Sequence, residues 1–213
     1  MSEHSIDCSN CRQQACWSEN PESGPSFCPT RTQKAATDSA LRAYRRNPEV
    51  RKMALAAART EGRSYMKWTR VEDTIDFARG MGYKKLGIAA CIGFMAEDRI
   101  LRDILAAHGF DVVSVCCKCG AVPKEELGLL DSEKAKPGTF EPICNPVAQA
   151  KILEGTGTDL NILLGLCVGH DTLFTKYSKA PVTTLVAKDR ITCHNPNAVL
   201  HGTSFYYKRL LSP

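Results

Sequence analysis

Apolar positions in the first half of the chain recur at helical spacing. Over residues 30–46 and 48–62, Ala, Leu, Met and Tyr return every three to four positions, which predicts two helices. Pro48 suits the first turn of the second helix, and Gly62 is expected to end it. A third helix is predicted over 69–82, because this stretch opens with a capping-box pattern and closes on glycine.

Short apolar runs alternate with helical patterns in the second half. Strands are predicted at 84–91, 110–117, 159–167 and 180–188, with helices at 96–109, 145–155 and 170–178. This alternation predicts an α/β protein with a small parallel, Rossmann-like sheet of about four strands and right-handed crossovers. The predicted domains are a cysteine-rich head, a basic helical segment packed on the main domain, and the α/β domain, at 1–29, 30–82 and 83–213.

The number of cysteines is the unusual feature of the composition. The 213 residues are 43% hydrophobic and 24% charged, as in globular proteins that need no disulfides, yet the chain has 11 cysteines. No apolar leader is present, and the longest apolar run is too short for a bilayer, so a cytoplasmic protein without membrane contact is expected. The cytosol keeps thiols reduced, which favours metal or redox chemistry over disulfides.

Charge is distributed unevenly. From Arg31 to Arg70 there are 11 Lys and Arg against three Asp and Glu, a net charge of +8, while the whole chain carries +5. A solvated helical face explains this pattern, and so does a surface for nucleic acid or an acidic partner. Aromatic residues are sparse there, which makes stacking on single-stranded bases a poor explanation.

The head contains four cysteines with a ligand-like spacing. The pattern is Cys8-x2-Cys11-x4-Cys16-x11-Cys28, followed by Pro29. Structural zinc sites commonly pair two close C-x2-C groups, whereas only one such pair exists here. Iron–sulfur clusters commonly take three grouped cysteines and a distant fourth that precedes proline. The spacing therefore favours a [4Fe–4S] cluster at the head, with zinc as the alternative.

The other cysteines fall at the predicted strand ends and in the loops that follow them. They are Cys91, Cys116, Cys117, Cys119, Cys144, Cys167 and Cys193. The carboxyl ends of parallel strands lie along one edge of a sheet, where ligands bind, so these thiols are expected to converge. Three cysteines around a cluster would leave one iron open to substrate, while two cysteines, a histidine and water would suit catalytic zinc.

Polar residues near the same edge are candidates for catalysis. His170 follows Cys167 by three positions and is a candidate ligand or proton donor. Asp171 is expected to be an N-cap. Lys188 and Arg190 follow the last strand, where a cation pair could hold an anionic substrate or balance a negative cluster.

The chain resembles a family of small prokaryotic proteins, mostly from anaerobes, that is described as a domain of unknown function and labelled metal-binding. The resemblance covers nearly the whole chain and is carried by CSNCRQQAC, WTRVEDTIDFARGMGYKKLGIAACIGF, CKCGAVPKEE, CNPVAQAKIL, LGLCVGHDTLF and APVTTLVAKDR…HNP. It implies metal binding and no particular reaction.

The resemblance also narrows the set of ligands. The positions that match the family are Cys8, Cys11, Cys16, Cys28, Cys91, Cys117, Cys119, Cys144 and Cys167, with His170 and Asp171. Cys116 and Cys193 stand where the family usually has other residues. All matched cysteines are therefore predicted to bind the cofactor, and all of them except Cys91 are predicted to be metal ligands.

Three functional hypotheses follow. The first is an iron–sulfur protein with one or two clusters and a redox or sulfur-handling role, served by a redox partner or a small sulfur-containing substrate. The second is a zinc protein whose basic helices contact nucleic acid or an acidic partner. The third is a metal carrier that uses the Cys117-x-Cys119 pair. Whether the protein is an enzyme stays open at this stage.

Overall fold

The computed structural model describes residues 6–212 and divides by its contacts into two compact units. One unit is residues 1–63, and the other is residues 64–213. The head and the first long helices thus share a unit, whereas the helix that precedes the sheet belongs to the second. The predicted boundaries at residues 29 and 82 do not coincide with this division.

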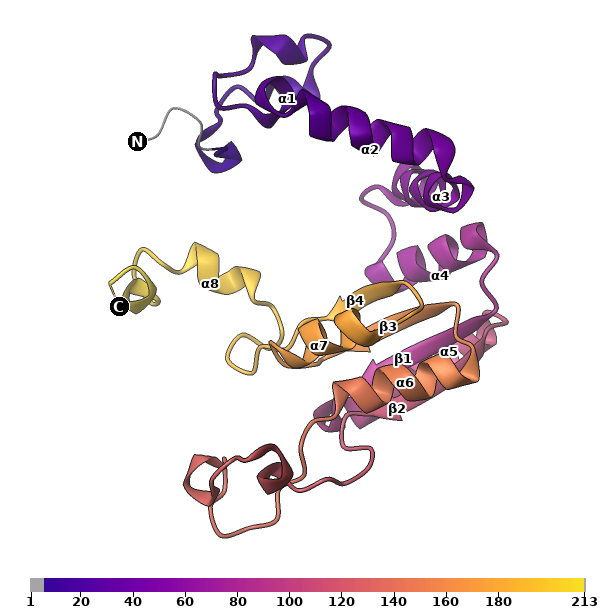
Figure 1. Ribbon diagram of the computed structural model, residues 1–213, viewed down its shortest axis with the longest axis vertical. Coiled ribbons are helices and arrows are strands. Elements are labelled where there is room, and N and C mark those ends of the chain that lie inside the picture. Colours follow the sequence, from indigo (N-terminus) through magenta and orange to yellow (C-terminus); the bar gives the residue numbers. More distant parts are fainter. Residues whose placement is uncertain (1–5, 213) are drawn as a thin grey trace. The chain divides into compact units, whose positions relative to one another are not determined.

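The first unit consists of short turns followed by helices (Figure 1). The turns are 3₁₀ helices at Cys8–Asn10, Ala15–Trp17 and Pro21–Ser23, and the helices are α1 (Pro29–Thr32), α2 (Lys34–Arg46) and α3 (Pro48–Ser64). The Asn47 side chain accepts hydrogen bonds from the amides of Glu49 and Val50 at 3.0 and 3.2 Å, which fixes the start of α3.

The predicted end of α3 at Gly62 is wrong. The helix continues to Ser64, and the residue that adopts a left-handed conformation is Met66, with φ 59°. The backbone amides of Lys67 and Trp68 both donate to the Ser64 carbonyl, so the chain turns one step later than the glycine suggested. A glycine is tolerated inside a helix when packing and hydrogen bonds beyond it continue the turn.

The second unit is built on a parallel four-stranded sheet, which confirms the predicted fold class. Its strands are β1 (Lys85–Ala90), β2 (Asp111–Cys116), β3 (Leu160–Leu164) and β4 (Val182–Val186), in the order β2-β1-β3-β4. The two central strands are almost wholly buried, as expected of a sheet covered on both faces. Leu86, Ile88, Leu160 and Ile162 are 0–1% exposed and form the centre of the core.

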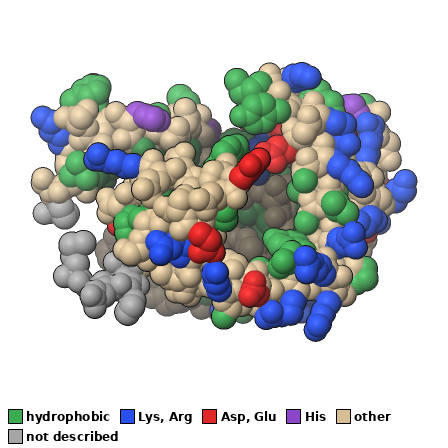
Figure 2. Space-filling model, turned by 90° about the horizontal axis from the view of Figure 1, so that it is seen from above, with side chains coloured by type: hydrophobic (Ala, Val, Ile, Leu, Met, Phe, Trp, Pro, Cys, Tyr) green, Lys and Arg blue, Asp and Glu red, His purple; other side chains and the backbone are tan. Residues whose placement is uncertain are grey.

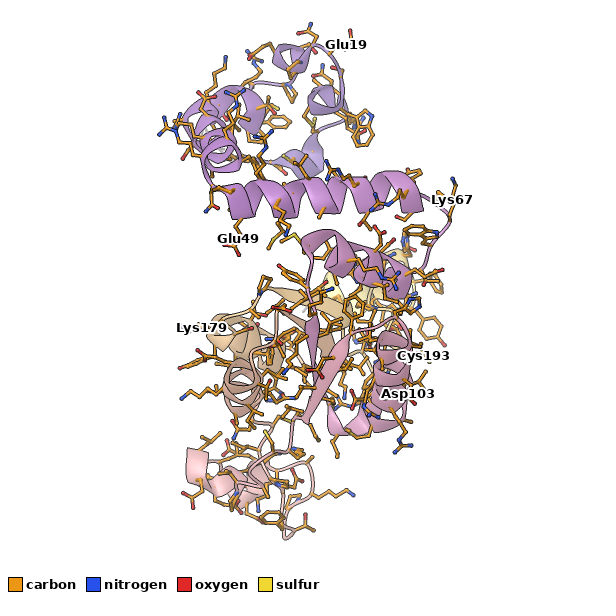
Figure 3. The ribbon with its side chains drawn as sticks, turned by 90° about the vertical axis from the view of Figure 1, so that its right-hand side faces the viewer. Glu19, Glu49, Lys67, Asp103, Lys179 and Cys193 are labelled. Carbon is orange, nitrogen blue, oxygen red and sulfur yellow. The ribbon has the colours of Figure 1, made fainter. Side chains whose placement is uncertain are left out.

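Helices cover both faces of this sheet. They are α4 (Arg70–Met81), α5 (Met95–Ala107), α6 (Pro146–Thr156) and α7 (His170–Tyr177). A further short helix, α8 (Asn197–His201), lies near the end of the chain. Helices α6 and α7 pack against each other in front of the sheet in Figure 1. In Figure 3, Asp103 of α5 and Lys179, just after α7, lie on opposite sides of it.

The caps predicted for α4 and α7 can be compared with the observed ends of these helices. The capping box at Thr69 and Glu72 forms as predicted, and α4 ends at Gly82 with φ 74°. The prediction that Asp171 caps α7 is wrong, because Gly169 occupies the N-cap position. Asp171 lies in the first turn, where its carboxylate accepts from the Thr172 amide at 2.7 Å.

The chain reverses its direction across the sheet between β1 and β3. From β1 it passes through α5 outward to β2, whereas from β3 it passes through α7 outward to β4 on the other side. Loops after β1 and β3 therefore diverge at their carboxyl ends, and the Phe94 ring lies against Gly165 between them. Open α/β sheets commonly bind ligands at such a point.

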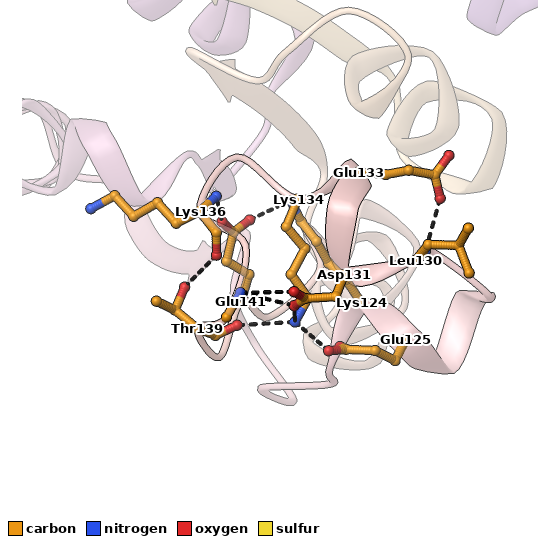
Figure 4. A network of polar contacts seen from close by, with 10 residues as sticks. Lys124, Glu125, Leu130, Asp131, Glu133, Lys134, Lys136, Thr139 and Glu141 are labelled. Atoms are coloured by element: carbon orange, nitrogen blue, oxygen red, sulfur yellow. Dashed lines mark hydrogen bonds and ion pairs between the residues drawn. The ribbon is translucent and has the colours of Figure 1, made fainter.

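A long connection between β2 and α6 is closed at its base by antiparallel backbone pairing. Pro123 and Pro142 form a bridge, the Ile143 amide donates to the Val122 carbonyl at 2.8 Å, and the Asn145 amide donates to the Cys117 carbonyl at 2.7 Å. Salt bridges hold the rest of the connection, including Lys124–Glu141 at 2.6 Å (Figure 4).

Candidate metal and thiol sites

The four head cysteines line one cavity. Cys8 begins the first 3₁₀ turn, Cys16 lies in the second, and Cys28 immediately precedes α1. With Cys11 they surround a cavity of about 450 Å³ whose other walls include Ala15, Trp17, Phe27 and Pro29. The predicted head ligands are thus brought together by turns that contain few apolar residues of their own.

The donor set of this cavity suits a metal group that is held by thiolates. A [4Fe–4S] cluster is ligated by four thiolates, and four cysteines border the cavity. A structural zinc ion takes the same four donors and would draw their sulfurs to about 3.8 Å from one another. Ala15 and Cys28 are buried, whereas Cys8, Cys16 and Trp17 are exposed, so one side of the site faces solvent.

Local contacts hold Cys28 in an environment that favours its thiolate. A hydrogen bond from the Thr30 side chain, followed in size by one from the Thr30 backbone, holds the pKa of Cys28 below its usual value. Gly24 lies against it, and a Cβ added there would come within 3.2 Å of the Cys28 sulfur. Arg31 donates to the Gly24 carbonyl at 2.6 Å and so ties this turn to α1.

At the sheet edge, strand ends bring Cys91 and Cys117 into contact. Cys91 is the first residue after β1, and Cys117 is the first after β2, its neighbour in the sheet. The Cys117 amide donates to the Ala90 carbonyl at 2.8 Å, which extends the strand pairing by one step. The Ile92 amide in turn donates to the Cys117 sulfur at 3.3 Å. Both thiols are buried, at 5% and 1% exposure.

The closed base of the β2–α6 connection adds Cys144 to this pair. The bond from the Asn145 amide to the Cys117 carbonyl places residue 144 beside the end of β2. Gln149 of α6, which is fully buried, donates to the carbonyls of Ala90 and Val115 at 3.1 and 2.6 Å. This side chain thereby joins the carboxyl ends of β1 and β2, and sequence analysis missed it because an isolated glutamine gives no sequence signal.

The three thiols share one hydrogen-bonded chain with Cys117 in the middle. A hydrogen bond from Cys117 is the main cause that lowers the pKa of Cys91 to about 4, with a further contribution from Lys188. The same donor lowers the pKa of Cys144 to about 5, helped by the charges of Lys118 and His170. The pKa of Cys117 is raised, first by its hydrogen bond with Cys144 and then by that with Cys91. Cys117 has a single proton and donates it to one neighbour at a time, so the chain favours a thiolate beside a protonated Cys117.

The loop after β4 brings two cations to this edge. Lys188 Nζ lies 2.6 Å from Cys91 Sγ and 5.0 Å from the centre of the Phe94 ring. Arg190 Nη2 lies 3.7 Å from Cys167 Sγ. Both predicted cations thus reach the thiols that follow β1 and β3.

Internal hydrogen bonds shape this loop. The Asp189 carboxylate accepts from the amides of Ile191 and Thr192, and its own amide donates to His194 Nδ1 at 3.1 Å. His194 also packs on Phe94, with ring centres 4.7 Å apart. Cys193 and His194 have φ of 52° and 66°, a left-handed pair that costs non-glycine residues energy and is often found at functional sites.

Three further cysteines, Cys116, Cys119 and Cys193, lie outside the chain of three thiols. Cys119 is half-buried, with its sulfur 4.0 Å from the Asn145 carbonyl, and burial raises its pKa. Cys116 accepts from the Lys118 amide at 3.5 Å. Cys193 is exposed (Figure 3). Lys118 was not singled out by sequence analysis, although its position between Cys117 and Cys119 offered a signal.

A converging set of metal ligands and a membrane-spanning helix are both absent from the described residues. Within residues 6–212, no three or more His, Cys, Asp and Glu side chains converge as ligands of a single metal ion. No helix in the same range has the length and apolar character needed to span a bilayer.

Comparison with known proteins identifies the family. Residues 28–185 match the model of a family described as "Protein of unknown function (DUF1847)". The chain belongs to the DUF1847 family. It is also 42% identical over 206 residues to an uncharacterized protein, MJ0455, of Methanocaldococcus jannaschii, a match that covers 97% of this chain and 98% of the relative. The family model begins at Cys28 and ends before Lys188, so it includes the thiols of the sheet edge but only one head cysteine.

Proposed function

We propose that this DUF1847 protein is an iron–sulfur protein whose head binds a [4Fe–4S] cluster through Cys8, Cys11, Cys16 and Cys28. One observation carries the proposal: the four predicted ligands line one cavity of about 450 Å³. Their spacing in the sequence, with a distant cysteine before proline, supports the same cofactor. Such a cluster supplies electron transfer or braces the head against unfolding.

The second part of the proposal gives the sheet edge a redox or sulfur-handling role. Three thiols linked through Cys117, with cations beside them, form a reactive set of the kind that exchanges sulfur or electrons. Cys91, Cys117 and Cys144 are the central residues, and Cys119 and Cys167 lie at their margin. A second cluster held by edge cysteines is the alternative use of the same thiols.

Metal analysis of anaerobically purified protein tests the head site. We expect about four irons and a matching amount of acid-labile sulfide per chain, with a broad visible absorption band. Replacing Cys8 and Cys11 with Ser should remove that iron, whereas the matched control Cys193→Ser should keep it. About eight irons in the native protein would assign a second cluster to the sheet edge.

A zinc protein with a basic interaction surface is the second candidate function. It is favoured by the exposure of every residue of α2 and by the arginines of its last turn, Arg45 and Arg46. Lys and Arg side chains gather on the right of Figure 2, where Figure 1 places α2 and α3. Stoichiometric zinc without labile sulfide would overturn the iron–sulfur proposal and support this one.

A further inference from the structure

Nucleophilic sulfur and cations meet at the sheet edge where the chain turns away from β1 and from β3. Cys91 follows β1 directly, and Lys188 Nζ lies 2.6 Å from its sulfur. Arg190 extends from the same loop to Cys167, beyond the end of β3. Among the described residues, neither cation forms an ion pair with a carboxylate. Two cations without a carboxylate partner at a ligand-binding edge favour a ligand that is a small anion.

The thiol beside these cations is suited to attack a ligand held by them. The Lys188 ammonium lies 2.6 Å from the Cys91 sulfur, where it stabilises negative charge. Cys91 itself is buried, whereas the next two residues, Ile92 and Gly93, are exposed. Gly93 adjoins the Lys188 ammonium, since a Cβ added there would lie 3.7 Å from Nζ. The side of Lys188 and Gly93 is therefore the one from which a small donor would reach Cys91.

We propose that Cys91 accepts a sulfane sulfur from a small anionic donor of the thiosulfate class, which Lys188 and Arg190 bind. This inference rests on the sulfur-handling role proposed above for the sheet edge. It assigns the edge a substrate class and gives each cation a part in binding.

The transfer balances without an external oxidant or reductant. The Cys91 thiolate attacks the outer sulfur of thiosulfate, a bond forms between the two sulfurs, and the S–S bond of thiosulfate breaks. Sulfite leaves with the electron pair, and Cys91 becomes a persulfide. A small thiol, acting as its thiolate, then attacks the terminal sulfur and takes it away as a new persulfide. The Cys91 thiolate is thereby restored, and a hydrogen bond from Cys117 stabilises it as the leaving group.

Loading of the full-length protein with thiosulfate tests the inference. The chain is purified without oxygen, reduced, freed of reductant and mixed with thiosulfate, and the products are followed by peptide mass spectrometry and by assay of released sulfite. We expect one added sulfur on Cys91 and an equal amount of sulfite. Cys91→Ser should lose both products, whereas Cys193→Ser, at an exposed thiol, should keep them. Sulfur found on Cys144 and absent from Cys91 would overturn the assignment.

Variants of the cations separate anion binding from disturbance of the fold. Lys188→Met should slow loading by about tenfold or more, as expected for the loss of one charge-assisted contact, and Lys188→Arg should recover part of the rate. The matched control Lys179→Met, at an exposed lysine after α7, should load at the native rate. With the uncharged reagent iodoacetamide in place of thiosulfate, Lys188→Met should lose less rate at Cys91, because only the stabilisation of the Cys91 sulfur by the ammonium is then missing. An equal loss with both reagents would contradict the anion site.

Iron and sulfide measured in the same samples distinguish this inference from the proposed function. Native iron content without sulfur loading would overturn the inference and leave the cluster in the head supported. Sulfur loading on Cys91 in a protein without iron would support the inference and overturn the iron–sulfur proposal. The variant with Ser at positions 8 and 11 should load sulfur at the native rate, because its changes lie in the other unit.

Discussion

Identical thiols in this protein are expected to differ in reactivity because their neighbours differ. Cys144 is half-buried and has a pKa lowered to about 5, first by a hydrogen bond from Cys117 and then by Lys118 and His170. Cys117, in the middle of the chain, has a raised pKa and is 1% exposed. The reactivity of each cysteine therefore depends on which thiol in the chain holds the proton. The spacing of the cysteines in the sequence does not reveal this distribution of protons.

Alkylation of the metal-free, reduced protein tests this difference. With a pKa near 5, Cys144 is almost fully ionised from about pH 6.5 upward, so its rate with iodoacetamide should be nearly constant up to about pH 8. The rate with free cysteine in the same buffer should rise by about tenfold per pH unit over the part of this range that lies below its pKa of about 8.5. Mass spectrometry of the Cys144 peptide and of alkylated free cysteine measures both rates. Parallel pH profiles would show that Cys144 is not ionised in this way.

Element by element, much of the sheet and of the helices could be predicted. The strands lie inside the predicted apolar runs, and the capping box at Thr69 forms, because burial periodicity and caps are local properties of the chain. The end of α3 was missed by two residues, and the N-cap of α7 was assigned to Asp171 when it is Gly169. At α3, hydrogen bonds from Lys67 and Trp68 to the Ser64 carbonyl set the boundary, and the preference of Gly62 did not.

Buried Asp98 of α5 allows a test of how one helix contributes to the stability of the fold. This residue of α5 is buried, accepts from the Ser114 hydroxyl of β2 at 2.6 Å, and has one carboxylate oxygen without a partner in the described structure. Burial raises its pKa, so the folded state holds the proton more tightly than the unfolded state, and stability falls as pH rises through the window above 3.8.

Asp98→Asn removes this titration and keeps a partner for Ser114. We expect the variant to be more stable than the native protein by about 1 kcal/mol at neutral pH, with the difference vanishing at low pH. Urea unfolding at several pH values measures it, and Asp103→Asn at an exposed position of α5 is the control. A variant that is less stable at neutral pH would show that the charge of Asp98 is compensated.

At the scale of the whole molecule, the two units differ in how they are held together. Among residues 6–63, few positions are buried, including Ala15, Cys28 and Ala56, whereas the second unit has a continuous apolar core around its sheet. A unit of that size with so little buried apolar surface commonly needs a metal or another constraint to be stable.

Removal of the proposed cluster should therefore affect the head selectively. After chelation, we expect hydrogen exchange in residues 6–28 to accelerate by about a hundredfold or more, because the binding energy of the proposed cluster would be part of the folding energy there. Exchange in β1 and β3 should stay near its native rate, since their core belongs to the second unit. Equal acceleration in both regions would mean that the metal stabilises the sheet as well.

The sequence by itself determined the parallel α/β sheet, the positions of most elements and the gathering of cysteines at the head and at strand ends. These features follow from apolar periodicity, helix caps and the rule that parallel strands end on one edge. Only the tertiary structure decided that Cys144 joins Cys91 and Cys117, and that Lys188 contacts Cys91. Those contacts connect residues far apart in the chain through the base of a long connection and through the loop after β4. No local pattern encodes such distances, because they depend on how the elements pack.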